Sequence, residues 1–311
     1  MNLILFGAAG FIGKNLAINL AKNIEDTITL VDTSKEYFND IKNELRENIV
    51  IKEDNIDEHT DFGSLLAGQD IVYHLVSTTA PTTSNQYIAL ELEKNLIVTV
   101  YMLEACIRNK IKKIIFFSSG GTVYGKDAVC PIGEDTLTYP ICSYGLQKVS
   151  IEKLLYLYWY MHGLDYRVIR LANPYGPYQR PNGSLGAVTT FTYKALKDEE
   201  IVVYGDGSVV RDFIYIDDVI KAVENIVKNK NEYRIFNVGC GYGVSIKKLL
   251  EIISELTGKN LKIVYKTERK VDVPENYLNI SRYERCYGKI SAIPLQEGIK
   301  KLIQFINGRD S

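Results

Sequence analysis

The stretch GAAGFIG, residues 7–13, follows the apolar run NLILF (residues 2–6) and opens an amphipathic stretch from Phe11 to Lys22. A strand, a glycine turn and a helix in this order are typical of a site that binds the pyrophosphate of a dinucleotide. Glycine allows the tight turn and the close approach of the backbone to phosphate, and the helix N-terminus supplies free N–H donors. We expect cofactor contacts from Gly7, Gly10, Phe11, Ile12 and Gly13.

A glycine triplet alone also fits a plain turn, so the surrounding pattern matters. Short apolar runs predict strands at residues 2–6, 27–31, 49–51, 71–76, 114–117 and 167–171. Helix-like segments lie between them, near residues 64–66, 86–109 and 144–162. Strands separated by helices imply a parallel sheet covered on both faces, so we predict a doubly wound, Rossmann-type α/β fold.

The second half of the chain has a different pattern. Proline and glycine crowd residues 174–186, which is typical of a loop. Further helices are expected near residues 187–197, 246–256 and 296–306, with strands near 201–204 and 234–238. We predict an NAD-binding domain of residues 1–173 plus about 212–240. Residues 174–211 and 241–311 would then form a smaller C-terminal α/β lobe for the substrate.

Asp32 directly follows the second predicted strand. A carboxylate there would accept hydrogen bonds from the adenosine ribose and repel a 2′-phosphate, which favours NAD over NADP. The alternative for such an aspartate is a turn or helix cap. Asp54, after the third strand, could face the adenine with its neighbours Asn55 and Ile56, although the charged run around it also fits a solvated loop.

Tyr144 and Lys148 are four residues apart and therefore share one face of a predicted helix. A free tyrosine has a pKa of ~10, and lowering it by ~3 units corresponds to ~4 kcal/mol of interaction. An ammonium and an oxidised nicotinamide would together supply such a shift, and the phenolate could then accept a hydroxyl proton as hydride leaves. With 22 tyrosines in the chain, this spacing also arises by chance.

The composition excludes several classes of protein. Lys plus Arg (37) nearly cancel Asp plus Glu (38), so we expect neither nucleic acid nor a membrane as a partner. The five cysteines form no CxxC pair and the three histidines have unrelated spacing, so we predict no metal site and a reducing compartment. With no signal peptide and no long apolar stretch, the expected location is the cytoplasm.

Together these motifs resemble the extended short-chain dehydrogenases/reductases, in the group of nucleotide-sugar epimerases and dehydratases. The other matching segments are YHLVS (73–77), SSGGTVYG (118–125), YGLQK (144–148), RLANPYGPYQRP (170–181), YGDGSVVRDFIYIDD (204–218) and NVG (237–239). These segments span almost the whole chain and are more specific for the family than for a substrate. The resemblance implies further cofactor contacts from Leu75, Val76, Ser77, Asn95 and Ser118, beside Tyr144 and Lys148.

The resemblance also implies that the C-terminal lobe binds a nucleotide sugar, which we expect to be UDP-linked. Arginine suits a diphosphate because its bonds are charge-assisted, although a lone arginine is usually a solvated surface charge. The substrate contacts implied in this way are Asn173, Leu185, Val203, Tyr204, Arg211, Arg269, Asp272 and Asn276. A small residue at Asn276, which bounds the hexose pocket in the family, suggests room for an N-acetyl group.

One position departs from the family pattern. A Ser or Thr four residues before the Tyr of the VYG element usually hydrogen-bonds the reacting oxygen, and Gly120 occupies that position here. Ser119 or Thr122 must then supply the hydroxyl, and the sequence does not decide between them. Dehydratases of the group carry Asp-Glu directly after that hydroxyl, where this chain has Gly121 and Thr122, so we do not expect dehydration.

The resemblance therefore favours 4-epimerisation of a nucleotide sugar, with tightly held NAD that is reduced and reoxidised in each cycle. Two alternatives stay open: a nucleotide-ketosugar reductase or dehydrogenase, and a non-catalytic relative that keeps NAD as a ligand. The relatives also form homodimers through the helices that correspond to Asn95–Arg108 and Tyr144–His162, so we expect a homodimer.

Overall fold

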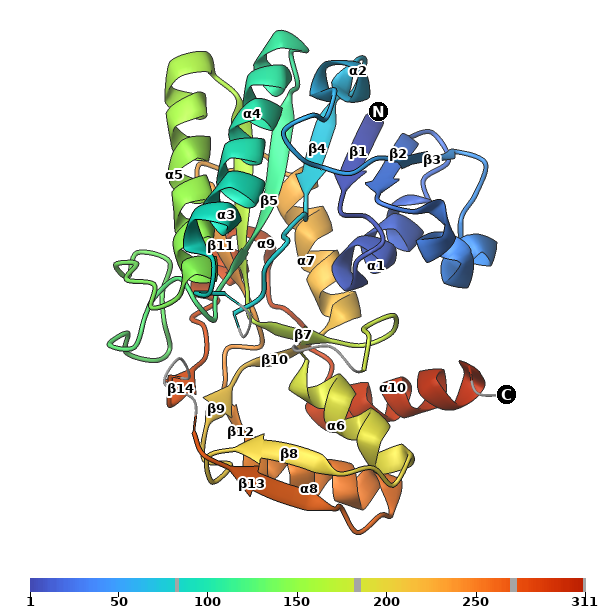
Figure 1. Ribbon diagram of the computed structural model, residues 1–311, viewed down its shortest axis with the longest axis vertical. Coiled ribbons are helices and arrows are strands. Elements are labelled where there is room, and N and C mark those ends of the chain that lie inside the picture. The colour runs from blue at the N-terminus through green and yellow to red at the C-terminus, as the bar shows by residue number, and fades with distance from the viewer. Residues whose placement is uncertain (82–83, 182–185, 269–272, 310–311) are drawn as a thin grey trace. The chain divides into compact units, whose positions relative to one another are not determined.

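The computed structural model describes residues 1–81, 84–181, 186–268 and 273–309. Seven strands within these residues form one parallel sheet in the order β11-β6-β5-β4-β1-β2-β3 (Figure 1). They are β1 (Asn2–Phe6), β2 (Thr27–Asp32), β3 (Ile49–Glu53), β4 (Ile71–His74), β5 (Lys113–Ser119), β6 (Asp165–Leu171) and β11 (Ile235–Val238). This strand order is that of a doubly wound nucleotide-binding fold, so the predicted fold class is confirmed.

Helices and helical turns connect these strands. They are α1 (Phe11–Leu20), η1 (Lys35–Glu44), α2 (Phe62–Leu66), α3 (Ile88–Leu92), η2 (Glu93–Ile97), α4 (Val98–Arg108) and α5 (Ser143–His162). The segments η1 and η2 are a 3₁₀-helix and a π-helix, respectively. The segments α3, η2 and α4 follow one another directly along the chain, and α5 lies beside them (Figure 1). The single helix predicted over residues 86–109 is therefore interrupted by a π-helical turn.

Apolar strand residues and the inner faces of α4 and α5 form a continuous core. Ile4, Phe116 and Met102 have no exposed surface, and Leu155 of α5 packs into the same cluster. Strands buried on both faces read as uninterrupted apolar runs, which explains why the sequence predicts these strands well. This core fixes the carboxyl ends of β1 and β4 and the position of α5, which carry most of the predicted NAD and catalytic residues.

The chain divides into two compact units. The first comprises residues 1–118, 142–169 and 226–235, and the second comprises residues 119–141, 170–225 and 236–311. The unit boundaries fall within β5, β6, α7 and β11 and just before α5, so they follow the packing of the chain. The sequence predicts domains according to the ligand that each would bind. These are an NAD-binding domain of residues 1–173 plus about 212–240 and a substrate lobe of about 174–211 plus 241–311, and these bounds stay a prediction.

The second unit contains several short sheets. The strand orders are β10-β7, β12-β9-β14 and β13-β8, with β13 and β8 parallel. The strands are β7 (Asn173–Tyr175), β8 (Ile201–Tyr204), β9 (Val210–Arg211), β10 (Phe213–Tyr215), β12 (Val244–Ser245), β13 (Ile263–Lys266) and β14 (Glu275–Asn276). The helices are α6 (Ala187–Leu196), α7 (Ile216–Lys228), α8 (Ile246–Thr257), α9 (Ser281–Tyr287) and α10 (Leu295–Arg309).

Candidate active site

The glycine turn joins β1 to α1 in a conformation that two of its glycines require. Gly7 has a φ of +80°, and a Cβ atom there would lie 3.0 Å from the backbone nitrogen of Val76. A Cβ atom on Gly13 would lie 2.6 Å from the carbonyl oxygen of Ala8. Both positions therefore exclude other residues for reasons internal to the fold.

Gly10 differs from these two glycines. The nearest atom to a Cβ placed on Gly10 is the carbonyl oxygen of Gly7, at 3.3 Å, so the fold itself nearly tolerates a side chain. Gly10 is also the N-cap of α1, whose first turn has neither a side-chain cap nor an acidic residue within the described chain. A helix N-terminus with free N–H donors fits a phosphate group, and a side chain on Gly10 would occupy the approach to it. These features fit NAD.

Asp32 links the end of β2 to the glycine turn. Its Oδ2 accepts a hydrogen bond from the backbone N–H of Ala9 at 2.8 Å, and its Oδ1 accepts one from Thr33 at 2.9 Å. The Thr33 hydroxyl also donates to Oδ1 at 3.4 Å, and since a carboxylate has about four lone-pair directions, these three donors still leave capacity for a ribose hydroxyl. The backbone N–H groups of Gly7 and Ala8 also donate to Val31 O, so the turn and the end of β2 are held together.

The other predicted cofactor residues of β3 and β4 lie near the carboxyl ends of those strands. The backbone N–H of Asp54 donates to Asp32 O at 3.0 Å, and partial burial raises the pKa of the Asp54 carboxyl. Asn55 donates to Asp57, whereas Ile56 packs into the core. Leu75 continues β4 through a bond from its N–H to Phe6 O. Their contacts with NAD stay predictions.

Asn95 lies in the π-helical turn η2 and holds the segment that follows β4. Its Oδ1 accepts the N–H of Thr78 at 2.9 Å, and its Nδ2 donates to Thr78 Oγ1 and to Glu91 O, each at 2.9 Å. Ser77 Oγ donates to Thr79 O within the same segment. The amide of Asn95 thus orders residues 77–79, where the sequence predicts cofactor contacts.

Tyr144 and Lys148 lie on the first two turns of α5. Lys148 is 5% exposed, its Nζ donates to Phe117 O at 2.9 Å, and Nζ lies 5.5 Å from the centre of the Tyr144 ring. Burial lowers the pKa of Lys148 to about 8, against the negative charge of Glu152, which raises it. Tyr144 keeps some exposed surface, yet desolvation raises the pKa of its phenol to about 12.

The chain by itself therefore does not prepare Tyr144 as a base. Lowering the pKa of Tyr144 requires a further positive charge, which an oxidised nicotinamide would supply. His74 is buried too: desolvation and then the charge of Lys148 lower its pKa to about 3. His74 is thus neutral and bonds to Thr99 Oγ1 at 3.0 Å, so it adds no positive charge beside Lys148.

The sequence analysis missed two buried carboxylates that contact α5. Glu152 accepts a bond of 2.6 Å from Ser118 Oγ, so the hydroxyl of this predicted cofactor residue is directed to α5. Glu91 accepts bonds from Ser143 Oγ at 2.5 Å and from Gln147 Nε2 at 3.1 Å, directly beside Tyr144. The position of Glu152, four residues after Lys148, was an available signal because i and i+4 share a helix face. Glu91 had no comparable signal.

In the second unit, Gly120 has a packing reason for its departure from the family pattern. A Cβ atom there would lie 2.6 Å from Leu278 Cδ1 and 3.2 Å from the carbonyl oxygen of Leu171. Asn276 Nδ2 donates to Gly120 O at 3.2 Å. A serine or threonine would thus clash with its surroundings unless Leu278 moved.

Two buried polar atoms near Gly120 have no hydrogen-bond partner among the described residues. They are the hydroxyl oxygen of Thr122 and Oδ1 of Asn276. A buried polar atom without a partner costs about 1–3 kcal/mol, so such atoms are rare unless a ligand or water completes them. Ser119 keeps some exposed surface and is not among these buried atoms. The hydroxyl of Thr122 could therefore take a ligand as its partner, and which of the two residues assists Tyr144 stays a prediction.

Asp212 gathers several predicted substrate residues of the second unit. Its backbone oxygen accepts bonds from the N–H and Nδ2 of Asn173 at 2.9 and 3.0 Å, and its N–H donates to Asn276 O at 3.2 Å. Its carboxyl, which has no exposed surface, accepts the N–H of Cys240 at 2.8 Å, and burial raises its pKa to about 6. The sequence analysis did not single out Asp212.

The remaining predicted substrate residues are spread over several strands. Arg211 lies on β9, beside Asp212, and its Nη1 donates to Val210 O and Val273 O at 2.8 Å each. Val203 is buried and Tyr204 is partly exposed on β8. Leu185, Arg269 and Asp272 lie outside the described residues.

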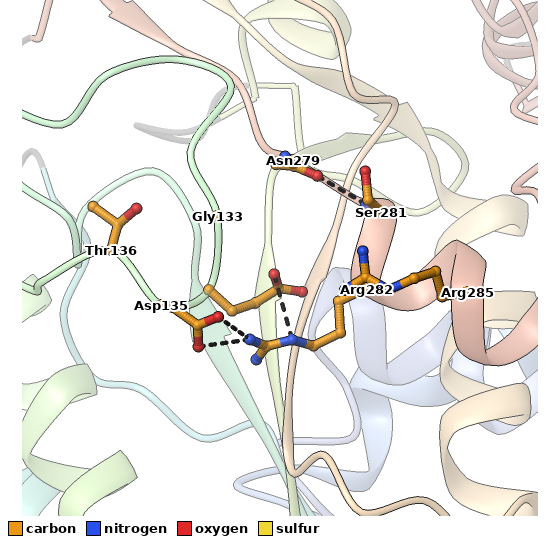
Figure 2. Close-up of a pocket in the computed structure, with 8 residues that line it drawn as sticks. Gly133, Asp135, Thr136, Asn279, Ser281, Arg282 and Arg285 are labelled. Carbon is orange, nitrogen blue, oxygen red and sulfur yellow. Dashed lines mark hydrogen bonds and ion pairs between the residues drawn. The ribbon is translucent and has the colours of Figure 1, made fainter.

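A pocket of about 400 Å³ in the second unit is lined by charged residues (Figure 2). Arg282 Nη2 donates to both carboxylate oxygens of Asp135 at 2.6 Å, and its Nε lies 3.7 Å from Glu134 Oε2. Glu134 Oε1 accepts the N–H of Asn237 at 3.0 Å. The charges of Arg282, Asp135 and Glu134 therefore satisfy one another, and Glu134 supports the NVG segment, which explains these three charges without a ligand.

The structure adds two observations on metal and membrane. Within the described ranges, no group of three or more His, Cys, Asp or Glu side chains is arranged to hold a metal ion. No helix in the part of the chain that the structure describes is long and apolar enough to cross a membrane.

Comparison with known proteins completes the description. The model of the NAD dependent epimerase/dehydratase family matches residues 3–239. UDP-glucose 4-epimerase of Mycolicibacterium smegmatis is 30% identical over 314 residues, 99% of both chains. A dTDP-4-dehydro-6-deoxyglucose reductase of Escherichia coli is 32% identical over 317 residues, 98% of this chain and 97% of that one. The structure of UDP-glucose 4-epimerase from Thermotoga maritima with UDP-glucose matches with a TM-score of 0.92 at 32% identity, over 100% of both chains.

Proposed function

Because the chain belongs to the NAD dependent epimerase/dehydratase family, we propose that it interconverts the C4 epimers of a UDP-linked hexose or N-acetylhexosamine. Membership confirms the predicted family resemblance and NAD as the cofactor, and makes the protein an enzyme of this family. The observation that carries the proposed reaction is the residue set around Gly120: a hydroxyl at Thr122 with no partner among the described residues, and no carboxylate at positions 121 and 122. Elimination of water would need such an acid.

Bound NAD supplies the acceptor for the hydride of C4′. Tyr144 accepts the proton of the 4′-hydroxyl, and Lys148 holds a positive charge beside the phenol ring that favours the phenolate. Thr122 hydrogen-bonds the same sugar oxygen and thereby positions it. The 4-keto sugar then turns, takes back the hydride on its other face and recovers the proton from Tyr144, so that no electrons or atoms are gained or lost.

The nucleotide end of the substrate is held by residues of the second unit. Asn173 and Arg211 are the proposed diphosphate contacts; Asp212, the residue after Arg211, accepts two hydrogen bonds from Asn173 and so links the two positions. Val203 and Tyr204, with Leu185, are proposed for the uridine side, and Arg269 and Asp272 for the diphosphate and ribose. Holding only the nucleotide leaves the hexose free to turn, which epimerisation at one carbon requires.

Asn276 bounds the hexose pocket in this proposal. Its Nδ2 is already bonded to Gly120 O, which assigns the amide orientation and leaves Oδ1 as an acceptor without a partner in the described chain. The N–H of an acetamido group or a sugar hydroxyl would complete it. We therefore propose that N-acetylhexosamines are accepted. Undetectable turnover of UDP-N-acetylglucosamine with rapid turnover of UDP-glucose would contradict this.

The proposed reaction is tested by measuring turnover of nucleotide sugars without added NAD or NADH. Purified protein is incubated with UDP-glucose, UDP-N-acetylglucosamine and other nucleotide hexoses, and the C4 epimers are resolved by chromatography. Epimerisation with no added NAD or NADH is expected, because the cofactor is reoxidised in each cycle and stays bound. The identity to a dTDP-4-dehydro-6-deoxyglucose reductase supports one alternative, a ketosugar reductase. Consumption of one NADH for each product, with no epimer formed, would establish that alternative.

A further inference from the structure

Helix α5 is tied to the end of β5 at two consecutive residues. Lys148 Nζ donates to the carbonyl oxygen of Phe117 at 2.9 Å, and the hydroxyl of Ser118 donates to Glu152 Oε1 at 2.6 Å. Lys148 and Glu152 are four residues apart on one face of α5 and are 5% and 3% exposed. The ammonium and the carboxylate thus enter the core together, one helical turn apart.

The charges around Lys148 make this carboxylate significant. Burial disfavours an ammonium, and the charge of Glu152 acts in the opposite direction, raising the pKa of Lys148. Among the described residues, His74 from β4 and Tyr144 from α5 also face Lys148, and His74 is neutral because its pKa is lowered to about 3. Tyr166 from β6 faces Glu152 and carries no charge at neutral pH.

We propose that Glu152 is a positioning residue for Lys148: held by Ser118, its carboxylate keeps the buried ammonium protonated beside Tyr144. This inference rests on the proposed roles of Tyr144 and Lys148. In this proposal Ser118 acts by holding Glu152, because the Ser118 hydroxyl has one proton and donates it to the Glu152 carboxylate. Glu152 does not touch the substrate in this scheme and acts only through Lys148.

The first test measures Lys148 directly and needs no substrate. The protein is labelled with ¹³Cε-lysine, the Lys148 resonance is identified by its loss in Lys148→Arg, and its chemical shift is followed with pH. In Glu152→Gln the titration midpoint should fall by at least half a pH unit, because a neutral amide no longer offsets the cost of burying the ammonium. Glu104→Gln, an exposed acid on the adjacent helix α4, is the matched control and should leave the midpoint unchanged.

The second test measures catalysis. The alkaline limb of the kcat–pH profile should move to lower pH in Glu152→Gln, since Tyr144 loses its charged neighbour earlier as pH rises. Glu152→Asp should restore most of the shift, because it restores the charge. KM for the nucleotide sugar should change less than twofold, since Glu152 contacts no substrate. A residue that served packing alone would lower stability without moving the pH profile.

A third variant keeps the proposal testable if Glu152→Gln does not fold, as judged by circular dichroism and thermal unfolding. Ser118→Ala keeps the charge but removes its hydrogen bond, and the Lys148 midpoint should fall by a smaller amount. The inference would be overturned by an unchanged Lys148 titration midpoint in a folded Glu152→Gln protein. If Glu152→Gln does not fold, an unchanged midpoint in Ser118→Ala would overturn it. Because the chemical-shift titration is independent of turnover, failure of the proposed epimerase activity would leave this result readable.

Discussion

At the scale of single residues, the hydroxyl beside the reacting carbon gives the sharpest prediction. Thr122→Val removes a buried hydroxyl that has no partner in the described residues while keeping the side-chain shape. We expect kcat to fall about 100-fold, because a hydrogen bond to the reacting oxygen is lost. The midpoint of thermal unfolding should stay the same or rise, since no protein hydrogen bond is broken.

The matched variants are Thr122→Ser, which keeps the hydroxyl, and Ser119→Ala, which removes the other candidate. Thr122→Ser should retain most of the activity, and Ser119→Ala should cost less than tenfold in kcat. A larger loss in Ser119→Ala than in Thr122→Val would assign the role to Ser119 instead.

The pKa of Tyr144 gives a second prediction. Desolvation raises this pKa to about 12 in the chain alone, so Tyr144 is protonated at neutral pH. Oxidised NAD should lower it, because the nicotinamide charge favours the phenolate. The measurement is phenolate absorbance against pH, with and without NAD⁺, taken as the difference between the protein and Tyr144→Phe. A Tyr144 titration that NAD⁺ does not move would contradict the assignment of Tyr144 as the base.

Tyr144→Phe should also abolish turnover while NAD affinity falls by no more than about tenfold, since one hydrogen bond to the cofactor contributes about 0.5–1.5 kcal/mol. Full turnover by Tyr144→Phe would exclude Tyr144 as the base. A wild-type protein that binds NAD and turns over no sugar nucleotide would instead support the non-catalytic alternative.

The spacing of Tyr144 and Lys148 places them on one helix face, and the family resemblance made their role and the departure at Gly120 visible in the sequence. The reason for Gly120 was not visible, because Leu278, which fills the space of a side chain there, lies far along the chain. Glu91 could not be recognised in the sequence for the same reason, because its bonds to Ser143 and Gln147 form only when α3 and α5 pack together.

At the scale of elements, the glycine turn allows a matched pair of variants. Gly10→Ala meets only the Gly7 carbonyl oxygen at 3.3 Å, whereas Gly13→Ala meets that of Ala8 at 2.6 Å. We expect Gly10→Ala to weaken NAD binding at least tenfold with little loss of stability. Gly13→Ala should lower the free energy of unfolding by about 1–3 kcal/mol. Calorimetric NAD titration and denaturant unfolding measure the two effects, and equal NAD affinity in Gly10→Ala would argue against phosphate binding there.

The predictability of the elements follows from their burial. Each strand of the parallel sheet contains a short apolar run, and the sequence predicts the strands from these runs to within a few residues. Helix α7 was missed, although Val219, Val223 and Ile226 are buried at helical spacing, because it follows the strand-like RDFIYI without a break. The two-residue strands β9, β12 and β14 have no periodic signal, since pairing with distant segments alone defines them.

At the scale of the whole molecule, the alternation of strands and helices was enough to predict the doubly wound fold. The bounds of the NAD and substrate domains were not settled in the same way. The compact units divide β5, β6, α7 and β11, and the chain that leaves β5, β6 and β11 belongs to the second unit. Composition along the chain cannot show this, because the change occurs inside continuous apolar strands.

The remaining whole-molecule prediction is a homodimer through α4 and α5. Tyr160, Met161 and Tyr156 on α5 are 74%, 62% and 53% exposed, and Tyr101 on α4 is 42% exposed. Tyr156 and Tyr160 stack on one another with ring centres 6.4 Å apart, which makes a flat aromatic surface. Trp159 is instead covered by the guanidinium of Arg234, 3.9 Å from its ring centre. Exposed aromatic area of this kind is typical of an interface core.

Wild-type protein should therefore elute at twice the mass of one chain in light scattering coupled to size-exclusion chromatography. The double variant Tyr156→Glu/Tyr160→Glu should elute as a monomer with unchanged circular dichroism, because two carboxylates would be desolvated in the interface. Tyr233→Glu, at a partly exposed position outside both helices, is the control and should remain dimeric. A dimeric Tyr156→Glu/Tyr160→Glu protein would show that the interface lies away from this face of α5. A monomeric wild-type protein would contradict the predicted homodimer.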